Sequence, residues 1–396
     1  MKFKKIIFLI LIIFLFLPLA SCDIHLENLF NNSKKESSSA TPSSWIIPSS
    51  SVASSSSIAE SSNIAEASNV VTSSNANSSN IIASSSSIYD KADIRYYLND
   101  YHDNYGYKEL CKVETYGDTL KNIYEAAYNQ ALEVLTSTSN YSTRTINDST
   151  MVVLDNISFY NTGITADMAG SVIMMVVYDN PLFYFLRSGY TNGSKSQGEV
   201  LKDQYVNLTL NEEYADYSVR QTINNYILDM FNEFDLSQDL STYSDVNKAK
   251  YINNYITNKI DYAYKDDGET PEDSSWAHNI EGFVNPTHYK GVCECYSKTY
   301  ELLSRYTGIE SILVTGYSNG NPANGHAWNY TMVDDKWYGV DVTWNDTSHN
   351  NYLLVGSNKM ESSPSHTPNG QNYGVRYMVP LPTLETNSYS FFPFGI

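Results

Sequence analysis

Three short motifs constrain this chain most: Gly291-Val292-Cys293, His326-Ala327-Trp328 and Asp341-Val342-Thr343-Trp344. A cysteine, a histidine and an acid in this order are the side chains that an activated thiol nucleophile needs. The histidine accepts the thiol proton, and the carboxylate fixes the tautomer of the imidazole. The motifs therefore predict a catalytic site made of Cys293, His326 and Asp341.

The segments around these motifs predict a helix followed by three strands. Cys293 opens a helical pattern that Gly308 is suited to end, and residues 311–317 are strand-like. Residues 326–333 and 336–344 flank the turn Asp334-Asp335 and predict a hairpin that carries both His326 and Asp341. The expected fold class is α+β, with a helical N-terminal part before an antiparallel sheet that packs on the cysteine helix.

The position of Cys293 favours a reactive thiol. A helix N-terminus offers a positive dipole end and unpaired amides, and a nearby imidazolium lowers the pKa of a thiol further. Cys295 follows two residues later. The helical period turns it about 200° away from Cys293, so both thiols cannot face His326.

The first residues indicate export. Residues 1–5 carry three lysines, residues 6–17 are unbroken apolar side chains, and Leu19-Ala20-Ser21-Cys22 follows Pro18. This ending resembles the lipobox of bacterial lipoproteins, which implies cleavage before Cys22 and acylation of its thiol. An uncleaved anchor is the alternative, although the apolar run is shorter than the ~20 residues of a spanning helix.

A serine-rich segment with loose repeats follows, from about residue 31 to residue 88. So little apolar surface cannot offset the entropy of ordering, which predicts a disordered stalk. Charged residues cancel over residues 1–88, so the formal net charge of -19 belongs to the remainder. A strongly acidic domain argues against nucleic acid and anionic lipid headgroups as partners.

The rest of the chain is long enough for one large domain or two small ones. Apolar residues recur at helical spacing from Leu120 to Val134, from Val219 to Met230 and from Ala249 to Ile260, and residues 168–177 suggest a buried helix. A short strand is expected at residues 182–186. The predicted organisation is a signal peptide (1–21), a lipid-anchored stalk (22–88), a mainly helical region (89–245) and a catalytic core (246–396).

Taken together, the motifs resemble the bacterial transglutaminase-like superfamily. Gly-Val-Cys with its helix, His-Ala-Trp-Asn and Asp-x-Thr-Trp carry the resemblance, which is strongest over residues 275–346. Weaker similarity reaches residues 179–184, and residues 352–355 with Met360 and His366. The resemblance implies a papain-like site in which Cys293 is the nucleophile, His326 the general base and acid, and Asp341 the group that orients the imidazole.

Cys295 departs from this family, whose members usually carry glycine at that position. It adds bulk in the first helical turn, where small residues allow close approach. Some relatives carry a residue upstream of the nucleophile that stabilises the oxyanion, and the sequence does not single out its counterpart in this chain. Trp276 and His278 are candidates, but packing of the loop explains them equally well.

Other interpretations of the same residues remain open. Cys293 could be a buried structural thiol, or a zinc ligand with Cys295 and His288, although that spacing is tight and a fourth ligand is missing. Trp328 and Trp344 suit a hairpin core better than a substrate platform. The remaining expectations are that His278, His349 and His366 are surface or capping residues, that Cys111 is buried, and that the chain has no disulfide framework.

These patterns predict an extracellular, lipid-anchored thiol enzyme that acts on peptide or amide bonds of a protein or peptide substrate, including peptides of the cell wall or cell surface. Hydrolysis is favoured over transamidation, because water is the only acceptor it needs. No cofactor or metal is implied, and the membrane is contacted through the lipid anchor. The alternative function is a non-catalytic surface binding module that keeps the fold.

Overall fold

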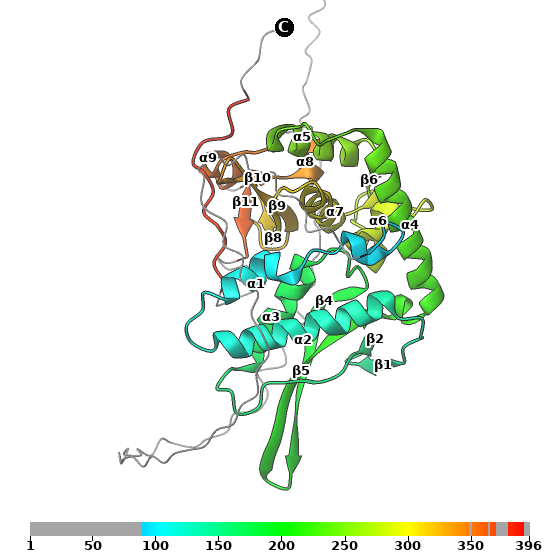
Figure 1. Cartoon of the computed structure of the whole chain (residues 1–396), viewed down its shortest axis with the longest axis vertical. Helices are drawn as coiled ribbons and strands as arrows, with labels where there is room; N and C mark the ends of the chain where they lie inside the picture. Colours follow the sequence, from blue (N-terminus) through cyan, green and yellow to red (C-terminus); the bar gives the residue numbers. More distant parts are fainter. Residues whose placement is uncertain (1–88, 348–350, 363–364, 370–378, 392–396) are drawn as a thin grey trace, which may run out of the picture. The chain divides into compact units, whose positions relative to one another are not determined.

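The structure is a computed structural model that describes residues 89–347, 351–362, 365–369 and 379–391 (Figure 1). The predicted signal peptide, the lipidation site Cys22 and the stalk lie outside the described residues. All described residues fall within one of the two contact units of the chain. No helix in this described part is long and apolar enough to cross a bilayer.

The predicted helices of the first half are present as α2 (Gly117–Thr136), α3 (Ala166–Asp179), α4 (Tyr217–Ser237) and α5 (Asp245–Thr257). A short helix that was not predicted, α1 (Tyr105–Leu110), precedes them. The apolar stripe from Leu120 to Val134 is fully buried on α2. On α3 the Thr165 hydroxyl accepts a hydrogen bond from the Met168 amide and caps the start of the helix. Burial of these apolar stripes, rather than helix propensity alone, holds the helices in place.

A five-stranded antiparallel sheet also lies in this half, and the sequence did not predict it. Its strands are β1 (Thr143–Ile146), β2 (Ser149–Val153), β3 (Ile157–Ser158), β4 (Leu186–Gln197) and β5 (Val200–Asn211). The expected strand at 182–186 is wrong except for its last residue, since β4 begins at Leu186. β4 and β5 form a long hairpin whose far end projects from the sheet (Figure 1).

The second half contains the helix and antiparallel sheet that the sequence predicted. The helices are α6 (Glu281–Val284), α7 (Cys293–Tyr306), α8 (Val342–Thr347) and α9 (Ser357–Met360), and the strands are β6 (Asp261–Tyr262), β7 (Lys290–Gly291), β8 (Ser311–Ser318), β9 (Gly325–Val333), β10 (Lys336–Val340) and β11 (His366–Pro368). The four-stranded sheet has the order β10-β9-β8-β11, and α7 packs against β8 and β9. This confirms the predicted α+β class.

Two turns explain where these elements end. Gly308 has a φ of 87° directly after the last residues of α7, and only glycine adopts this conformation without strain. Asp334 and Asp335 both have positive φ, 52° and 59°, which matches the tight turn that suits the twist of a hairpin. The expected strand at 336–344 is too long, because the chain leaves β10 at Val340 and begins α8.

Candidate active site

Cys293 is the first residue of α7, as predicted. The short strand β7 leads into it, and Val292 is extended and donates its amide hydrogen to the carbonyl of Ala277 at 2.9 Å. Gly291 leaves no room for a side chain, since a Cβ there would lie 2.4 Å from the Cβ of Cys295. The Cys293 thiol is thereby placed at the positive end of the α7 dipole.

The cysteines correct one expectation. Cys111 is exposed rather than buried. The Cys293 side chain is fully buried. Nucleophilic chemistry at Cys293 requires a reduced thiol that the substrate can reach.

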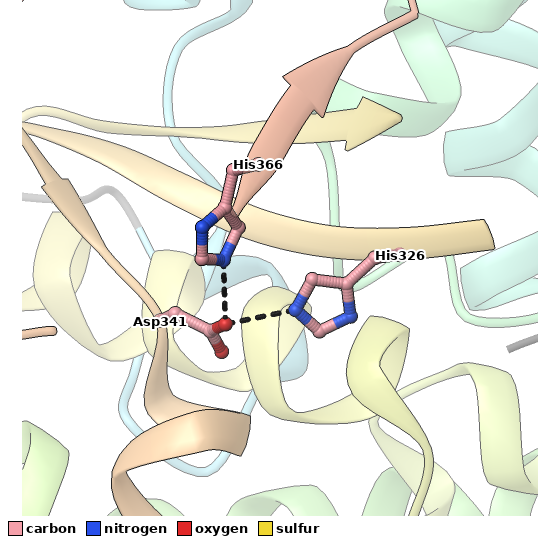
Figure 2. A group of neighbouring side chains, drawn as sticks. All are labelled: His326, Asp341 and His366. Carbon is pink, nitrogen blue, oxygen red and sulfur yellow. Dashed lines mark hydrogen bonds and ion pairs between the residues drawn. The ribbon is translucent and has the colours of Figure 1, made fainter. Parts of the chain in front are cut away.

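His326 and Asp341 are brought together as predicted. Nε2 of His326 lies 2.8 Å from Oδ2 of Asp341, and the two side chains are 5% and 0% exposed (Figure 2). His326 is the second residue of β9, and Asp341 follows the neighbouring strand β10 directly. Asp341 is thus not on a strand; its Oδ1 accepts the Trp344 amide hydrogen at 3.0 Å and caps the start of α8.

His366 is a member of the same group, which corrects its expected place at the surface. It is 2% exposed, and its Nε2 also lies 2.8 Å from Oδ2 of Asp341. Figure 2 shows both imidazoles directed at this one carboxylate. β11 pairs antiparallel with β8, opposite Ser318, and this pairing brings His366 to the site.

The charges of this group follow from its contacts. Burial alone would raise the pKa of the Asp341 carboxyl, but the imidazoles of His326 and His366 hold that pKa well below its usual range. Burial lowers the pKa of His366, which favours the neutral ring although Asp341 opposes the shift. An ionised carboxylate only accepts hydrogen bonds, so both rings are assigned the tautomer that donates from Nε2. Nδ1 of His326 is then the atom that can take a proton.

The surroundings of Cys295 disfavour a reactive thiol. It is fully buried, and its sulfur faces Gly282, where an added Cβ would lie 3.2 Å away. Burial raises the pKa of the Cys295 thiol to about 12, so the thiolate is not populated near neutral pH. This agrees with the prediction that the helical period turns Cys295 away from the site.

His278 belongs to a buried cluster of charged side chains that also contains Glu294 and Lys298 of α7. Its Nδ1 lies 2.8 Å from Oε2 of Glu294, and its Nε2 lies 3.2 Å from the carbonyl of Glu272. Burial alone would raise the pKa of Glu294, but Lys298 and His278 hold it at about 2. Because both ring nitrogens are engaged, His278 is neither a surface residue nor a ready oxyanion donor.

The zinc alternative finds no support in these contacts. His288 stacks on Trp276 with ring centroids 3.9 Å apart, and its Nε2 faces Glu281 at 4.0 Å. Within the described ranges, the residues with ligand-like spacing are His326, Asp341 and His366 instead. His349 lies outside the described residues.

Comparison with known families matches this part of the chain. Residues 235–342 match the family model of the transglutaminase-like superfamily. The chain carries a transglutaminase-like domain. The matched range contains Cys293, His326 and Asp341, whereas His366 lies beyond its end.

Relatives of the transglutaminase-like domain are distant. Kyphoscoliosis peptidase of Mus musculus is 24% identical over 144 residues, which are 34% of this chain and 20% of that protein. The chain thus spans about a fifth of the length of this curated relative.

Solved structures that are similar to this chain also match only part of it. A structure titled as a TGase has 15% identity and a TM-score of 0.27 over 43% of this chain and 49% of that chain. A putative cysteine protease from Cytophaga hutchinsonii has 14% identity and a TM-score of 0.22 over 55% and 71%. The periplasmic domain of TgpA from Pseudomonas aeruginosa has 17% identity and a TM-score of 0.19 over 38% and 59%.

The two tryptophans of the domain's motifs differ in role. Trp328 is fully buried in the hairpin, as the sequence favoured. Trp344 is partly buried, and its ring stacks on His326 with centroids 5.5 Å apart and an interplanar angle of 27°. Trp344 therefore supports the imidazole through both its ring and the amide that Asp341 caps.

Proposed function

We propose that this protein is a thiol enzyme that cleaves peptide or amide bonds through Cys293, His326 and Asp341. The observation that carries the proposal is the buried hydrogen bond of 2.8 Å between His326 and an Asp341 carboxylate held in its ionised form. Such a carboxylate orients an imidazole and stabilises the imidazolium that forms when it takes a proton.

The proposed reaction begins with proton transfer from the reduced Cys293 thiol to Nδ1 of His326. The thiolate then attacks the carbonyl carbon of the substrate, and the tetrahedral adduct collapses to a thioester as the amine leaves with the proton from Nδ1. A water molecule gives a proton to the same nitrogen and attacks the thioester, which releases the acid and restores the thiol. The α7 dipole favours the thiolate at the start of each cycle.

Hydrolysis is the favoured outcome, because water suffices as the acceptor. A primary amine that replaces water would give transamidation through the same thioester. Incubation of the reduced protein with a fluorescent primary amine and a glutamine-rich protein separates the two. Loss of substrate with no amine incorporated supports hydrolysis, and incorporation that outpaces cleavage would make the protein a transamidase.

We further propose that the enzyme acts outside the cell, anchored by lipid at Cys22, on proteins or on peptides of the cell wall or surface. The support is the lipobox-like ending of the leader and the serine-rich segment after it. Mass spectrometry of the mature N-terminus is the test, with Cys22→Ala as the variant. We expect an acylated N-terminus in the parent, and release or lack of processing in the variant; a mature chain that retains residues 1–21 without lipid would refute the anchor.

A non-catalytic binding module is the second candidate. The observation that favours it is the complete burial of Cys293, because a nucleophile must be reached by its substrate. A binding module would need none of the proton-transfer geometry at Asp341, and it would hold a partner equally well without the thiol.

The deciding experiment traps the nucleophile with a panel of peptide electrophiles in the presence of a reductant. Parent, Cys293→Ala and Cys295→Ala are compared for adduct formation and for cleavage of a labelled protein substrate. We expect adduct and cleavage in the parent and in Cys295→Ala, and neither in Cys293→Ala. Cleavage that survives in Cys293→Ala, or a partner bound equally by all three with no cleavage, would overturn the proposal.

A further inference from the structure

One carboxylate oxygen of the site is shared by two imidazoles. Oδ2 of Asp341 lies 2.8 Å from Nε2 of His326 and 2.8 Å from Nε2 of His366 (Figure 2). The reaction proposed above uses His326 and gives no part to His366. A buried side chain that makes a charge-assisted hydrogen bond to the orienting carboxylate requires an explanation of its own.

We propose that His366 is a positioning residue for this reaction, which holds the Asp341 carboxylate facing His326 by a hydrogen bond to their shared oxygen. The inference rests on the proposed function. It adds a residue from β11, a strand beyond the part of the chain that matches the superfamily.

Asp341 is held at both oxygens. Oδ1 accepts the amide hydrogen of Trp344 at 3.0 Å, and Oδ2 accepts from the two imidazoles. With both oxygens engaged, rotation of the carboxylate about the Cβ–Cγ bond would break at least one hydrogen bond. His366 thus helps to fix the direction from which the Asp341 carboxylate approaches His326.

The surroundings of His366 favour a neutral ring and hold it in place. Trp344, Trp328 and Tyr352 surround it, with ring centroids 4.4, 5.0 and 5.1 Å away. The titratable groups that face it are Asp341, His326 and Tyr352. Burial lowers the pKa of His366 and favours the uncharged imidazole, whereas Asp341 and the Met360 backbone oppose this shift. A neutral donor stabilises the carboxylate without a positive charge that would compete with the imidazolium of His326.

The same three residues could be taken for a metal site, but the distances favour hydrogen bonds. A zinc ion with its ligands at 2.0–2.1 Å would hold neighbouring ligand atoms roughly 3.3 Å apart in tetrahedral geometry. Both nitrogens lie instead 2.8 Å from Oδ2, which is the normal length of a charge-assisted hydrogen bond. Metal dependence is therefore an outcome that would contradict the proposal.

The test compares His366→Gln, whose amide can still donate a hydrogen bond to Asp341, with His366→Leu, which cannot. The control is His102→Leu, which removes an exposed histidine whose Nδ1 lies 2.6 Å from Asp100. For each full-length, reduced protein we would measure kcat, KM, and the rate of Cys293 alkylation by iodoacetamide as a function of pH. Thermal melting reports whether each variant is folded.

We expect His366→Leu to lower kcat about 10- to 100-fold with KM unchanged, the size of losing one hydrogen bond to a charged group. We also expect the acid limb of its alkylation profile to move up by about one pH unit, because a less well held carboxylate supports the imidazolium less. His366→Gln should restore most of both values, and His102→Leu should match the parent.

Equal kcat and equal pH profiles in the parent and in a folded His366→Leu protein would overturn the positioning role. So would activity that falls with a chelator and returns with added zinc, since that result assigns the cluster to a metal. Failure of the proposed function gives a different result, in which the parent itself shows neither turnover nor preferential alkylation of Cys293.

Discussion

Two fully buried carboxylates of this domain, Asp341 beside the imidazoles and Glu301 on α7, behave in opposite ways. Asp341 is shared by two imidazoles, and its pKa lies well below the usual range. Glu301 lies 2.5 Å from Nη2 of Arg305, a guanidinium that also faces Asp179 at 3.7 Å. Burial, aided by Asp179 and opposed by Arg305, raises the pKa of Glu301 to about 8.

The difference lies in the neighbours, since burial is the same. Asp341 accepts hydrogen bonds from three donors, which are the two imidazoles and the Trp344 amide. At Glu301 one guanidinium is shared by two buried carboxylates, so one of the two is protonated more readily. A buried acid can therefore orient an imidazole in one place and act as a pH-sensitive structural group in another.

The largest effect is expected from His326→Ala. Without the imidazole no group takes the thiol proton, so kcat should fall to background, a loss on the order of 10⁶ for a triad member of this kind. The measurement is cleavage of a labelled protein under reducing conditions, with Cys293→Ala as the reference for zero turnover. Activity well above that reference would remove His326 from the mechanism.

Asp341→Asn tests the comparison most sharply when paired with Glu301→Gln. The Asp341 variant loses the charge that orients and stabilises the imidazolium, and kcat should fall on the order of 10⁴. Glu301→Gln removes a carboxylate of equal burial about two turns along α7 from Cys293 and should keep kcat near the parent value. Similar losses in both would mean that the site depends on packing of α7 and not on the charge at Asp341.

The pH dependence of stability tests Glu301. Its native pKa of about 8 lies above that of an unfolded glutamate, so the native state binds the extra proton. This contribution to the free energy of unfolding is fully present below pH ~4.5 and is lost as the pH rises through 8. Relative to the parent, Glu301→Gln should gain on the order of a few kcal/mol between pH 5 and pH 9, read from urea midpoints. A variant that is less stable than the parent at both pH values would show an ionised Glu301 bound to Arg305.

The smallest effect is expected from Cys295→Ala. Removing a buried sulfur from the tight contact with Gly282 and Gly291 should lower the free energy of unfolding by about 1 kcal/mol and leave kcat nearly unchanged. Urea unfolding and the cleavage assay measure the two quantities. A large gain in kcat would show instead that the bulk of Cys295 obstructs the approach of the substrate to Cys293.

The sequence predicted the part of the fold that local patterns encode. The start of α7 at Cys293, its end at Gly308 and the turn at Asp334-Asp335 depend on residues close in sequence, and all three are confirmed. These features place Cys293 on a helix that packs against β9, the strand of His326, and they place Asp341 next to His326.

Sequence patterns do not predict the elements and contacts that depend on pairing between residues far apart in the chain. The tip of the β4–β5 hairpin is rich in Ser, Lys, Gln and Gly and exposed on both faces, so it has no apolar alternation to reveal a strand. The apolar pattern continues past Val340 into α8 and predicts a strand through Asp341, whereas the structure ends β10 at Val340. His366 reaches the site only through the pairing of the three-residue strand β11 with β8, and no spacing in the sequence reports that contact.

The central claim, that Cys293 and not its neighbour is the activated thiol, is tested most directly by limited alkylation of the reduced protein. Iodoacetamide is added in substoichiometric amount between pH 5 and pH 9, and peptide mapping gives the label at Cys293, Cys295 and Cys111. We predict that Cys293 is labelled well below pH 8 and before both other thiols, because the α7 dipole and the His326 imidazolium favour its thiolate. Preferential labelling of Cys295, whose thiol pKa burial raises to about 12, would contradict the account.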